Sequence, residues 1–392
     1  MKVLLNTTTL FEGGALQLGT SMTREALQDS SGIQWQFATS RGVVNELSRF
    51  HPEAIGQMEV FDDSPAVNRS ARRRLIELEA HWRPDCVFTA YGPAYVKFAA
   101  PHVCGAASPW VAHADFSAYR VMNFPVEWLQ VFFLSIYRGY WFRQADVLAA
   151  ETEYTRQGFH KRLGFPLDRI AVVSNTCGQH YLDNQGRRPF PSRDERLRIL
   201  CFAAPHKHKR LDSIPDVAKQ LAARQPELDF EFVTTLNHDE PMWRDIAARA
   251  AARGVTDHVR NLGRIPVADG PKLYQGSHIC FMPTVLECFS ATYPEAMAMG
   301  LPIVTTDLGF VRDICRDAAL YYRPFDPGAA ADRIVQLLGD EPLWNELIDR
   351  GKRVLEGLPT SHEKYLQYVD LVRLLVDSKK PGSNRRVEAQ RM

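Results

Sequence analysis

Short apolar runs alternate with segments of helical pattern along most of the chain, and this alternation is the sequence feature that most constrains its fold. Residues 3–5 form an apolar run, Gly13 and Gly14 follow in a loop, and residues 15–27 have a helical pattern. Strand–loop–helix units of this kind are typical of a parallel α/β sheet with helices on its faces. In the first half of the chain we expect further strands at 86–90, 110–112, 147–150 and 170–173, and a helix at 70–81.

A second series of the same kind begins after residues 183–196, a stretch that is rich in Pro, Arg, Asp and Asn and has little apolar periodicity. Its predicted strands are 198–203, 230–234, 259–262, 278–282, 302–305 and 319–321. Its predicted helices are 214–224, 242–252, 268–275, 294–299 and 329–338. The fold class is therefore α/β, with two Rossmann-like, doubly wound domains and a cleft between them in which the carboxyl ends of both sheets meet a ligand.

The length of 392 residues suits two domains. We place an N-terminal domain at 1–182, a linker at 183–196 and a C-terminal domain at 197–358. Residues 361–376 have the pattern of an amphipathic helix, so a helix at 359–378 is expected to pack back on the N-terminal domain. Residues 379–392 are polar and contain Pro and Gly, which predicts a disordered tail.

Charge and cysteine usage exclude several classes of function. The 47 basic and 46 acidic side chains balance to a net charge of +1, so no overall field attracts nucleic acid. The seven cysteines are scattered without C-x-x-C or zinc-ligand spacing, which is typical of reduced thiols and predicts no metal site. The N-terminus lacks the pattern of a signal peptide, and no apolar run approaches the ~20 residues of a membrane span. We therefore expect the protein to be cytoplasmic.

The most informative stretch is 283–307, in which a predicted strand enters a turn and then a helix. Pro294 supports the start of this helix, and Gly300 and Pro302 mark its end. The N–H groups of a helix start favour an anion, so the loop before it is expected to bind a diphosphate through Cys288, Phe289, Ser290, Ala291 and Thr292.

Glu295 lies at the start of the same helix, where its carboxylate can accept hydrogen bonds from a ribose diol. A second interpretation is structural. Thr292 and Glu295 have the spacing of a capping box, in which Glu295 would only satisfy a backbone donor.

The run PTVLECFSATYPEAMAMGLPIVTTD resembles the signature of glycosyltransferase family 4, whose members are retaining enzymes with the GT-B fold. In that signature two glutamates lie eight positions apart, here Glu287 and Glu295. The resemblance implies that Glu295 binds the ribose and that Glu287 lies near the transferred sugar or the catalytic centre. The sequence departs from the commoner Gly-Phe-Gly pattern of the family at Cys288 and Ser290, and the loss of two glycines restricts the loop.

A second resemblance lies at the opening of the C-terminal domain, CFAAPHKHKRLDSIPDVAKQL, and it selects Lys209 as the family's lysine. An ammonium near a diphosphate neutralises the charge that grows on the leaving group as the glycosidic bond breaks. The usual partner arginine is absent, since Ala203 and Ala204 occupy that region, and Lys207, His208 or Arg210 are candidates to replace it. The alternative is an ordinary solvated basic turn.

In the N-terminal half, Gly13 and Gly14 resemble the family's Gly-Gly loop, which faces the donor phosphates and the acceptor. An ordinary turn is the alternative. His113 is expected at the end of the predicted strand 110–112 and resembles the family's catalytic-region histidine. A structural histidine is the alternative.

The segment 128–142 is unusually aromatic. Our preferred interpretation is core, and the alternative is an interfacial surface that brings a lipid-linked acceptor within reach. The basic residues 72–74 have two interpretations of the same kind, contact with anionic lipid or a solvated helix face.

Taken together, the resemblance implies retaining transfer of a sugar from a nucleotide-diphosphate sugar to a glycan or a lipid-linked intermediate of polysaccharide biosynthesis, with no cofactor and no bound metal. Lys209 and the helix start would replace the cation, since no Asp-x-Asp metal motif ends a predicted strand. Peripheral contact with the inner face of the membrane is compatible with this function. A nucleotide-sugar epimerase, a phosphorylase and an inactive nucleotide-sugar-binding subunit are the alternatives. An oxidoreductase is disfavoured because no G-x-G-x-x-G follows the first strand.

Overall fold

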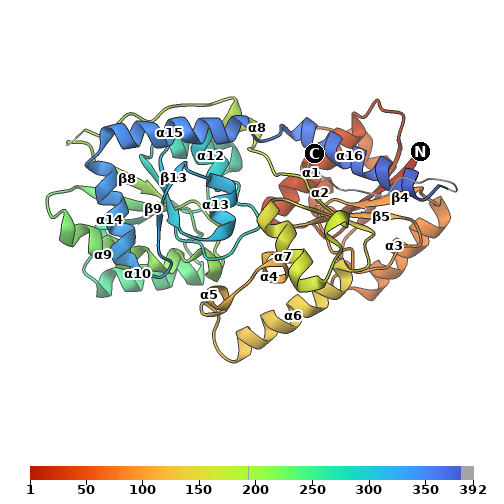
Figure 1. Ribbon diagram of the computed structural model, residues 1–392, viewed down its shortest axis with the longest axis horizontal. Coiled ribbons are helices and arrows are strands. Elements are labelled where there is room, and N and C mark those ends of the chain that lie inside the picture. Colours follow the sequence, from red (N-terminus) through yellow and green to blue (C-terminus); the bar gives the residue numbers. More distant parts are fainter. Residues whose placement is uncertain (193, 381–392) are drawn as a thin grey trace. The chain divides into compact units, whose positions relative to one another are not determined.

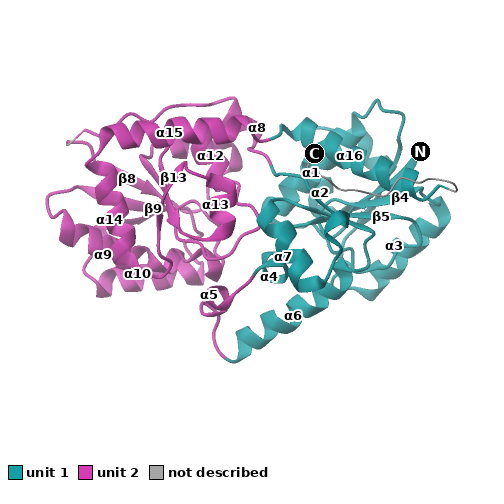
Figure 2. Ribbon diagram, viewed as in Figure 1, with its two compact units in different colours: residues 1–113, 125–175, 359–392 teal, residues 114–124, 176–358 magenta. Residues whose placement is uncertain are grey.

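The computed structural model describes residues 1–192 and 194–380. The chain forms two compact units, which Figure 2 shows in teal and magenta. The first comprises Met1–His113, Pro125–Asn175 and the chain from Pro359 on, and the second comprises Ala114–Phe124 and Thr176–Leu358.

The boundary between the units precedes the predicted linker at 183–196, which lies within the second unit. The backbone of this stretch pairs with that unit, since Gly186 N donates to Ala298 O at 3.0 Å and Arg188 N to Gly300 O at 3.0 Å. The polar composition of 183–196 is therefore that of a surface segment of the second unit. The predicted domain end at 182 and the predicted linker at 183–196 are wrong, because the second unit already begins at Thr176.

The first unit is built on a parallel sheet of seven strands in the order β3-β2-β1-β4-β5-β6-β7 (Figure 1). All of its strand pairs are parallel, and β1 pairs with both β2 and β4. The strands are β1 (Lys2–Thr7), β2 (Gln34–Ser40), β3 (Met58–Phe61), β4 (Cys86–Thr89), β5 (His102–Ala106), β6 (Val147–Ala150) and β7 (Ile170–Val172).

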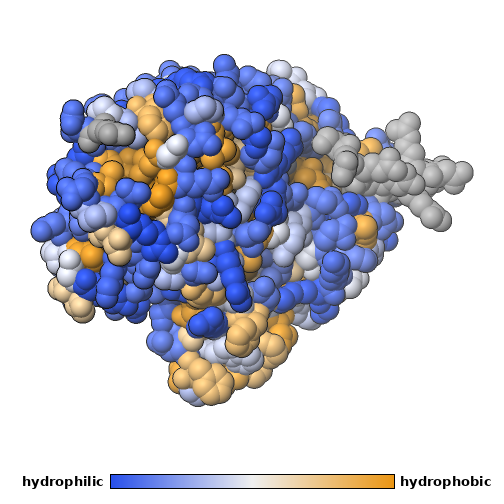
Figure 3. Space-filling model, turned by 60° about the vertical axis from the view of Figure 1, so that its left-hand side comes forward, coloured by the Kyte–Doolittle hydropathy of each residue, from blue (hydrophilic) through white to orange (hydrophobic). Residues whose placement is uncertain are grey.

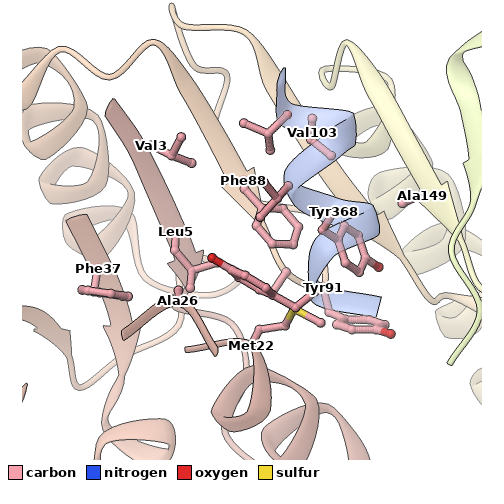
Figure 4. Close-up of a cluster of buried hydrophobic side chains, with 14 of the residues drawn as sticks. Val3, Leu5, Met22, Ala26, Phe37, Phe88, Tyr91, Val103, Ala149 and Tyr368 are labelled. Carbon is pink, nitrogen blue, oxygen red and sulfur yellow. The ribbon is translucent and has the colours of Figure 1, made fainter. Parts of the chain in front are cut away.

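Helices cover both faces of this sheet because successive strand residues point to opposite sides. Val3 and Leu5 belong to one core cluster (Figure 4). Leu4 belongs to another. The first cluster includes residues of α1 (Gly13–Leu27), α2 (Arg41–Leu47) and α16 (Ser361–Ser378). The clusters on the other face include residues of α3 (Arg69–Trp82), α4 (Pro109–Ala112), α6 (Val126–Phe142) and α7 (Glu153–Leu163).

The C-terminal helix α16 is part of the first unit, where its Tyr368 ring stacks on Phe88 with centroids 4.7 Å apart (Figure 4). Lys364 of this helix is only 1% exposed. Its ammonium donates to Tyr91 Oη at 3.1 Å and to Asn175 Oδ1 at 2.7 Å, and Tyr91 donates to Glu151 Oε1 at 3.0 Å. A buried polar network therefore joins α16 to the carboxyl ends of the strands. Of the predicted disordered tail, residues 381–392 lie outside the described residues, and Lys379 is the C-cap of α16.

The second unit has a parallel six-stranded sheet in the order β10-β9-β8-β11-β12-β13 (Figure 1). Its strands are β8 (Leu197–Leu200), β9 (Phe230–Thr234), β10 (Val259–Asn261), β11 (Ile279–Met282), β12 (Ile303–Thr306) and β13 (Ala319–Tyr322).

Two core clusters, one on each face of this sheet, attach its helices. One cluster includes residues of α9 (Ile214–Arg224), α10 (Pro241–Ala252), α14 (Pro327–Leu338) and α15 (Glu341–Glu356). The other includes residues of α8 (Gln179–Leu182), α11 (Gly270–Gln275), α12 (Thr292–Ala298) and α13 (Gly309–Cys315). The short helix α5 (Phe116–Tyr119) also belongs to the second unit. Both units are thus doubly wound, and the predicted α/β fold class is confirmed.

Two expectations for the first unit are wrong. The predicted strand 110–112 is the helix α4, because Pro109 occupies its first turn and the neighbouring strand is β5. The aromatic segment 128–142 is not core. Within α6 only Gly139 and Phe142 are buried, whereas Phe133 is 63% exposed and Ile136 56% exposed.

Candidate functional site

Topology brings two loops of the second unit together. Strands β8 and β11 are neighbours in the sheet, and the strand order runs outward from them in opposite directions. The carboxyl ends of two such strands form the switch point at which ligands of doubly wound folds bind. The loop after β8 contains the 3₁₀ turn Lys207–Lys209, and Val285 in the loop after β11 donates its N–H to His208 O at 2.8 Å. This hydrogen bond holds the two loops next to each other.

Lys209 and Glu287 meet across these loops. The Lys209 ammonium donates a hydrogen bond to Glu287 Oε1, and the side chains are 12% and 9% exposed. Thr284 also donates to Glu287 Oε1, at 3.2 Å. A buried carboxylate needs such partners, because an uncompensated charge away from water is costly.

Glu295 of α12 lies close to this pair. Tyr274 of α11 donates a 2.9 Å hydrogen bond to Glu295 Oε2. Burial raises the pKa of Glu295 to about 7, and the Tyr274 hydrogen bond and the positive charge of Lys209 act in the opposite direction. The Lys209 ammonium thus stabilises the charged forms of both Glu287 and Glu295. A further hydrogen-bond donor to Glu295 would lower its pKa.

The capping-box interpretation of Glu295 is wrong. The N-cap of α12 is Ala291, which makes no side-chain cap hydrogen bond, and Thr292 is the first helical residue. Thr292 donates instead to Phe202 O at 3.0 Å, while Glu295 accepts from Tyr274. Both side chains of the supposed box are used elsewhere.

The loop at 288–290 keeps an ordinary backbone despite its missing glycines. Among the residues that the structure describes, five non-glycine residues have a positive φ, and none of them lies at 288–290. The Cys288 and Ser290 side chains are buried, Phe289 is half-buried and Ala291 is exposed. The two substitutions are therefore compatible with this loop conformation without backbone strain.

Of the three candidates to replace the absent arginine, His208 is uncharged and Arg210 has other partners. Burial lowers the pKa of His208 to about 3, with further lowering by Lys209 and His206, so His208 is neutral at physiological pH. Arg210 donates to Asp212 at 3.0 Å and stacks over the Phe325 ring. Lys207 lies half-buried in the same turn as Lys209.

The remaining predicted site residues belong to the first unit. Gly13 and Gly14 are exposed at the start of α1, and Gly13 has φ +63°, which favours glycine. His113 follows α4 and does not end a strand, so its predicted setting is wrong. Its ring contacts Tyr154 edge-on with centroids 4.9 Å apart.

Two further residues, Tyr274 and Thr284, were not expected at the site, and they donate hydrogen bonds to Glu295 and Glu287. Thr284 precedes Glu287 by three residues in the same loop, and this spacing could have predicted the hydrogen bond between them. Tyr274 comes from α11, before the strand, and only the packing of that helix brings its hydroxyl to Glu295.

The two doubly wound sheets, with a lysine and two glutamates at the switch point of the second, define a GT-B protein. Residues 184–354 match the family model described as glycosyl transferases group 1. This match confirms the predicted resemblance for the second unit, and the chain as a whole has the GT-B fold.

Similar proteins fit this class. The O-antigen chain mannosyltransferase B of Escherichia coli is 22% identical over 211 residues, 52% of this chain and 54% of the relative. The phosphatidyl-myo-inositol mannosyltransferase of Mycobacterium leprae (strain TN) is 30% identical over 135 residues, 30% of this chain and 36% of the relative. The matched stretches thus span about half or less of the length of these curated relatives.

Solved structures resemble the chain over nearly its whole length. A glycosyltransferase from Rickettsia africae ESF-5 has a TM-score of 0.70 at 15% identity, covering 96% of this chain and 99% of that one. Anabaena Alr3699/HepE in complex with UDP and glucose has a TM-score of 0.70 at 14% identity, covering 95% and 99%. This likeness shows the two-domain GT-B fold.

Proposed function

We propose that the protein transfers a sugar from a nucleotide-diphosphate sugar to an acceptor in glycan biosynthesis, either a glycan or a lipid-linked intermediate. The observation that carries the proposal is the convergence of Lys209, Glu287 and Glu295 at the carboxyl ends of β8 and β11. The relatives named for mannosyl transfer and the similar structure described with UDP and glucose support a nucleotide-sugar donor.

Each residue has a role in this proposal. Lys209 stabilises the negative charge of the leaving nucleoside diphosphate. The family resemblance implies that this lysine takes the place of a bound metal ion. Glu295 accepts hydrogen bonds from the ribose hydroxyls, and these bonds favour its charged form. Glu287 holds Lys209 in place before the donor binds and lies beside the transferred sugar.

The reaction follows from these roles and from the retention of configuration that the family resemblance implies. The bond between the anomeric carbon and the diphosphate oxygen breaks, and the acceptor hydroxyl oxygen forms a new bond on the same face of the sugar. The hydroxyl proton leaves with the diphosphate. As the resemblance implies, Gly13 and Gly14 of the first unit are proposed to face the donor phosphates and the acceptor, and His113 is proposed to be a catalytic residue.

Thermal unfolding in the presence of UDP, GDP, ADP and dTDP tests the donor site, because a ligand that binds only the folded state raises its stability. We expect one base to stabilise the wild type. We expect Glu295→Gln to weaken its binding about 10-fold to 100-fold, since a hydrogen bond to a charged group contributes about 1.5–3 kcal/mol. Glu356→Gln, which removes the same charge at an exposed position, is the matched control. No shift with any nucleotide would refute the proposal.

A second assay separates the alternatives. Donor incubated without an acceptor is expected to show only slow hydrolysis by a transferase, whereas an epimerase would convert all of it to an equilibrium mixture. Glu287→Ala is expected to abolish transfer. Full function in cells carrying this variant would instead favour a nucleotide-binding subunit without activity.

A further inference from the structure

Helix α6 presents an apolar stripe to solvent. Val126, Leu129, Phe133, Ile136 and Tyr140 follow one another at intervals of three or four residues, so they share one side of the helix. All five are exposed, with Val126 at 62% and Phe133 at 63%. Figure 3 shows apolar surface gathered at the lowest part of the molecule, where Figure 1 places α6.

The other side of the helix is attached to the first unit. The Phe142 ring packs edge-on against Phe159 of α7 with centroids 5.1 Å apart, and Gly139 lies close to Leu163. Phe142 and the stripe point in nearly opposite directions at 100° per residue. A normal surface helix is apolar inward and polar outward, whereas α6 is apolar on both sides.

Two arginines lie at the attached end of α6. Arg143, which is exposed, follows the helix as its C-cap, and Arg72 of α3 donates to the Tyr137 hydroxyl at 2.8 Å. Arg72 also lies over the Trp141 ring. The one acidic residue of α6 is Glu127 in its first turn. By contrast, Arg73 and Arg74 are paired with Glu77 and Glu59, so they belong to an ordinary solvated helix face.

We propose that this stripe is a docking surface for an anionic lipid membrane, with α6 lying in the plane of the interface. Phe, Leu and Ile side chains enter the acyl boundary, Tyr and Trp lie at headgroup level, and the arginines bind anionic headgroups, which is the composition of an interfacial helix. Among the described residues no helix is long and apolar enough to cross a membrane.

Sedimentation of the full-length protein with vesicles tests the proposal. We expect binding to vesicles of phosphatidylglycerol and phosphatidylcholine in equal parts, weaker binding to pure phosphatidylcholine, and loss of the difference at high salt. Phe133→Asn should weaken vesicle binding about tenfold or more, because the variant no longer buries a phenylalanine side chain in the acyl boundary. Phe50→Asn is the matched control, since Phe50 is 70% exposed in the loop after α2.

Three outcomes would overturn the proposal. They are the absence of vesicle binding, equal loss in both variants, and equal affinity for neutral and anionic vesicles. The main alternative is that the stripe binds a second copy of the chain, and sedimentation velocity tests it. A wild-type dimer that dissociates in the Phe133→Asn variant would support this alternative and overturn the proposal. No sugar nucleotide is present in these measurements, so their failure is distinct from a failure of the proposed function.

Discussion

The Lys209 ammonium donates a hydrogen bond to the Glu287 carboxylate across two loops that follow neighbouring strands. Because both side chains are largely buried, removing one of them leaves the other charge without compensation. We expect Lys209→Met to lower the free energy of unfolding by about 3–5 kcal/mol.

The double variant Lys209→Met/Glu287→Gln should recover most of this stability, because the Glu287 charge that Lys209 balanced is then also removed. Urea unfolding of the four proteins in the cycle measures the coupling. Arg73→Met is the control at an exposed pair, with an expected cost below about 1 kcal/mol. Simple additivity of the two substitutions at Lys209 and Glu287 would contradict the prediction.

The raised pKa of Glu295 predicts a stability that depends on pH. Its folded value of about 7 lies above the ordinary value of 4.5, so between these two values the folded state binds more protons than the unfolded chain. The contribution of Glu295 to stability is therefore full at low pH and is lost as the pH rises from about 4.5 to 7. Glu295→Gln, which resembles the protonated group, should remove this dependence and be more stable than the wild type above pH 7, by up to about 3 kcal/mol.

Chemical unfolding across this pH range measures the effect. Tyr274→Phe offers an independent check, because the loss of its hydrogen bond should move the transition to higher pH. Parallel curves for wild type and Glu295→Gln would show that this carboxyl group does not titrate as expected.

Sequence reasoning worked where local signals agreed with the fold. The predicted helix 214–224 and strand 230–234 have the bounds of α9 and β9 in the structure. Pro at the start of α9 marks the helix, and the aromatic and β-branched residues of the sequence FEFVT mark the strand. Strand β2, with the sequence QWQFATS, and strand β5, with HVCGA, escaped detection because polar residues and glycine interrupt their patterns.

The failures at the site and surface have a different cause, which is that tertiary packing decides them. The aromatic content of 128–142 favoured core, but only Gly139 and Phe142 of α6 are buried. Glu295 and Thr292 had the spacing of a capping box, yet Tyr274 and the Phe202 carbonyl, both distant in sequence, take their hydrogen bonds. Spacing within one segment contains no information about such partners.

Lys364 is expected to stabilise the packing of α16 within the first unit. Lys364→Met should lower stability by about 3–5 kcal/mol, since Glu151 is then buried without its cation, and adding Glu151→Gln should restore most of the loss. Hydrogen exchange of α16 amides is the local measurement. Lys352→Met, at an exposed position of α15, should leave this exchange unchanged.

The pH dependence of the same lysine has the opposite sign to that of Glu295. Burial lowers the pKa of Lys364 to about 8 from 10.5, so between these values the unfolded chain binds more protons than the folded state. Stability from this group therefore rises as the pH increases through that window. The Lys364→Met variant should lack the rise, and its persistence in the variant would assign it to another group.

Gly300 should tolerate no side chain, since two separate constraints act on it. Its φ is +66°, and an added Cβ would lie 2.3 Å from the backbone oxygen of Gly186. Gly254 has a similar φ of +69° but open space around it, so it separates the two constraints. Gly254→Ala is expected to cost about 1–2 kcal/mol through its backbone conformation alone. Gly300→Ala should cost a further 1–3 kcal/mol or so, because the chain at 186 must move.

The Gly300 substitution should also reach the candidate site. Gly300 follows α12, and its N–H donates to Met297 O at 3.1 Å, so a shift there displaces the helix that positions Glu295. We therefore expect Gly300→Ala to weaken the stabilisation by nucleotide, whereas Gly254→Ala should preserve it. Thermal unfolding with and without nucleotide separates these effects, and equal losses of stability in the two variants would show that the contact with Gly186 relaxes without cost.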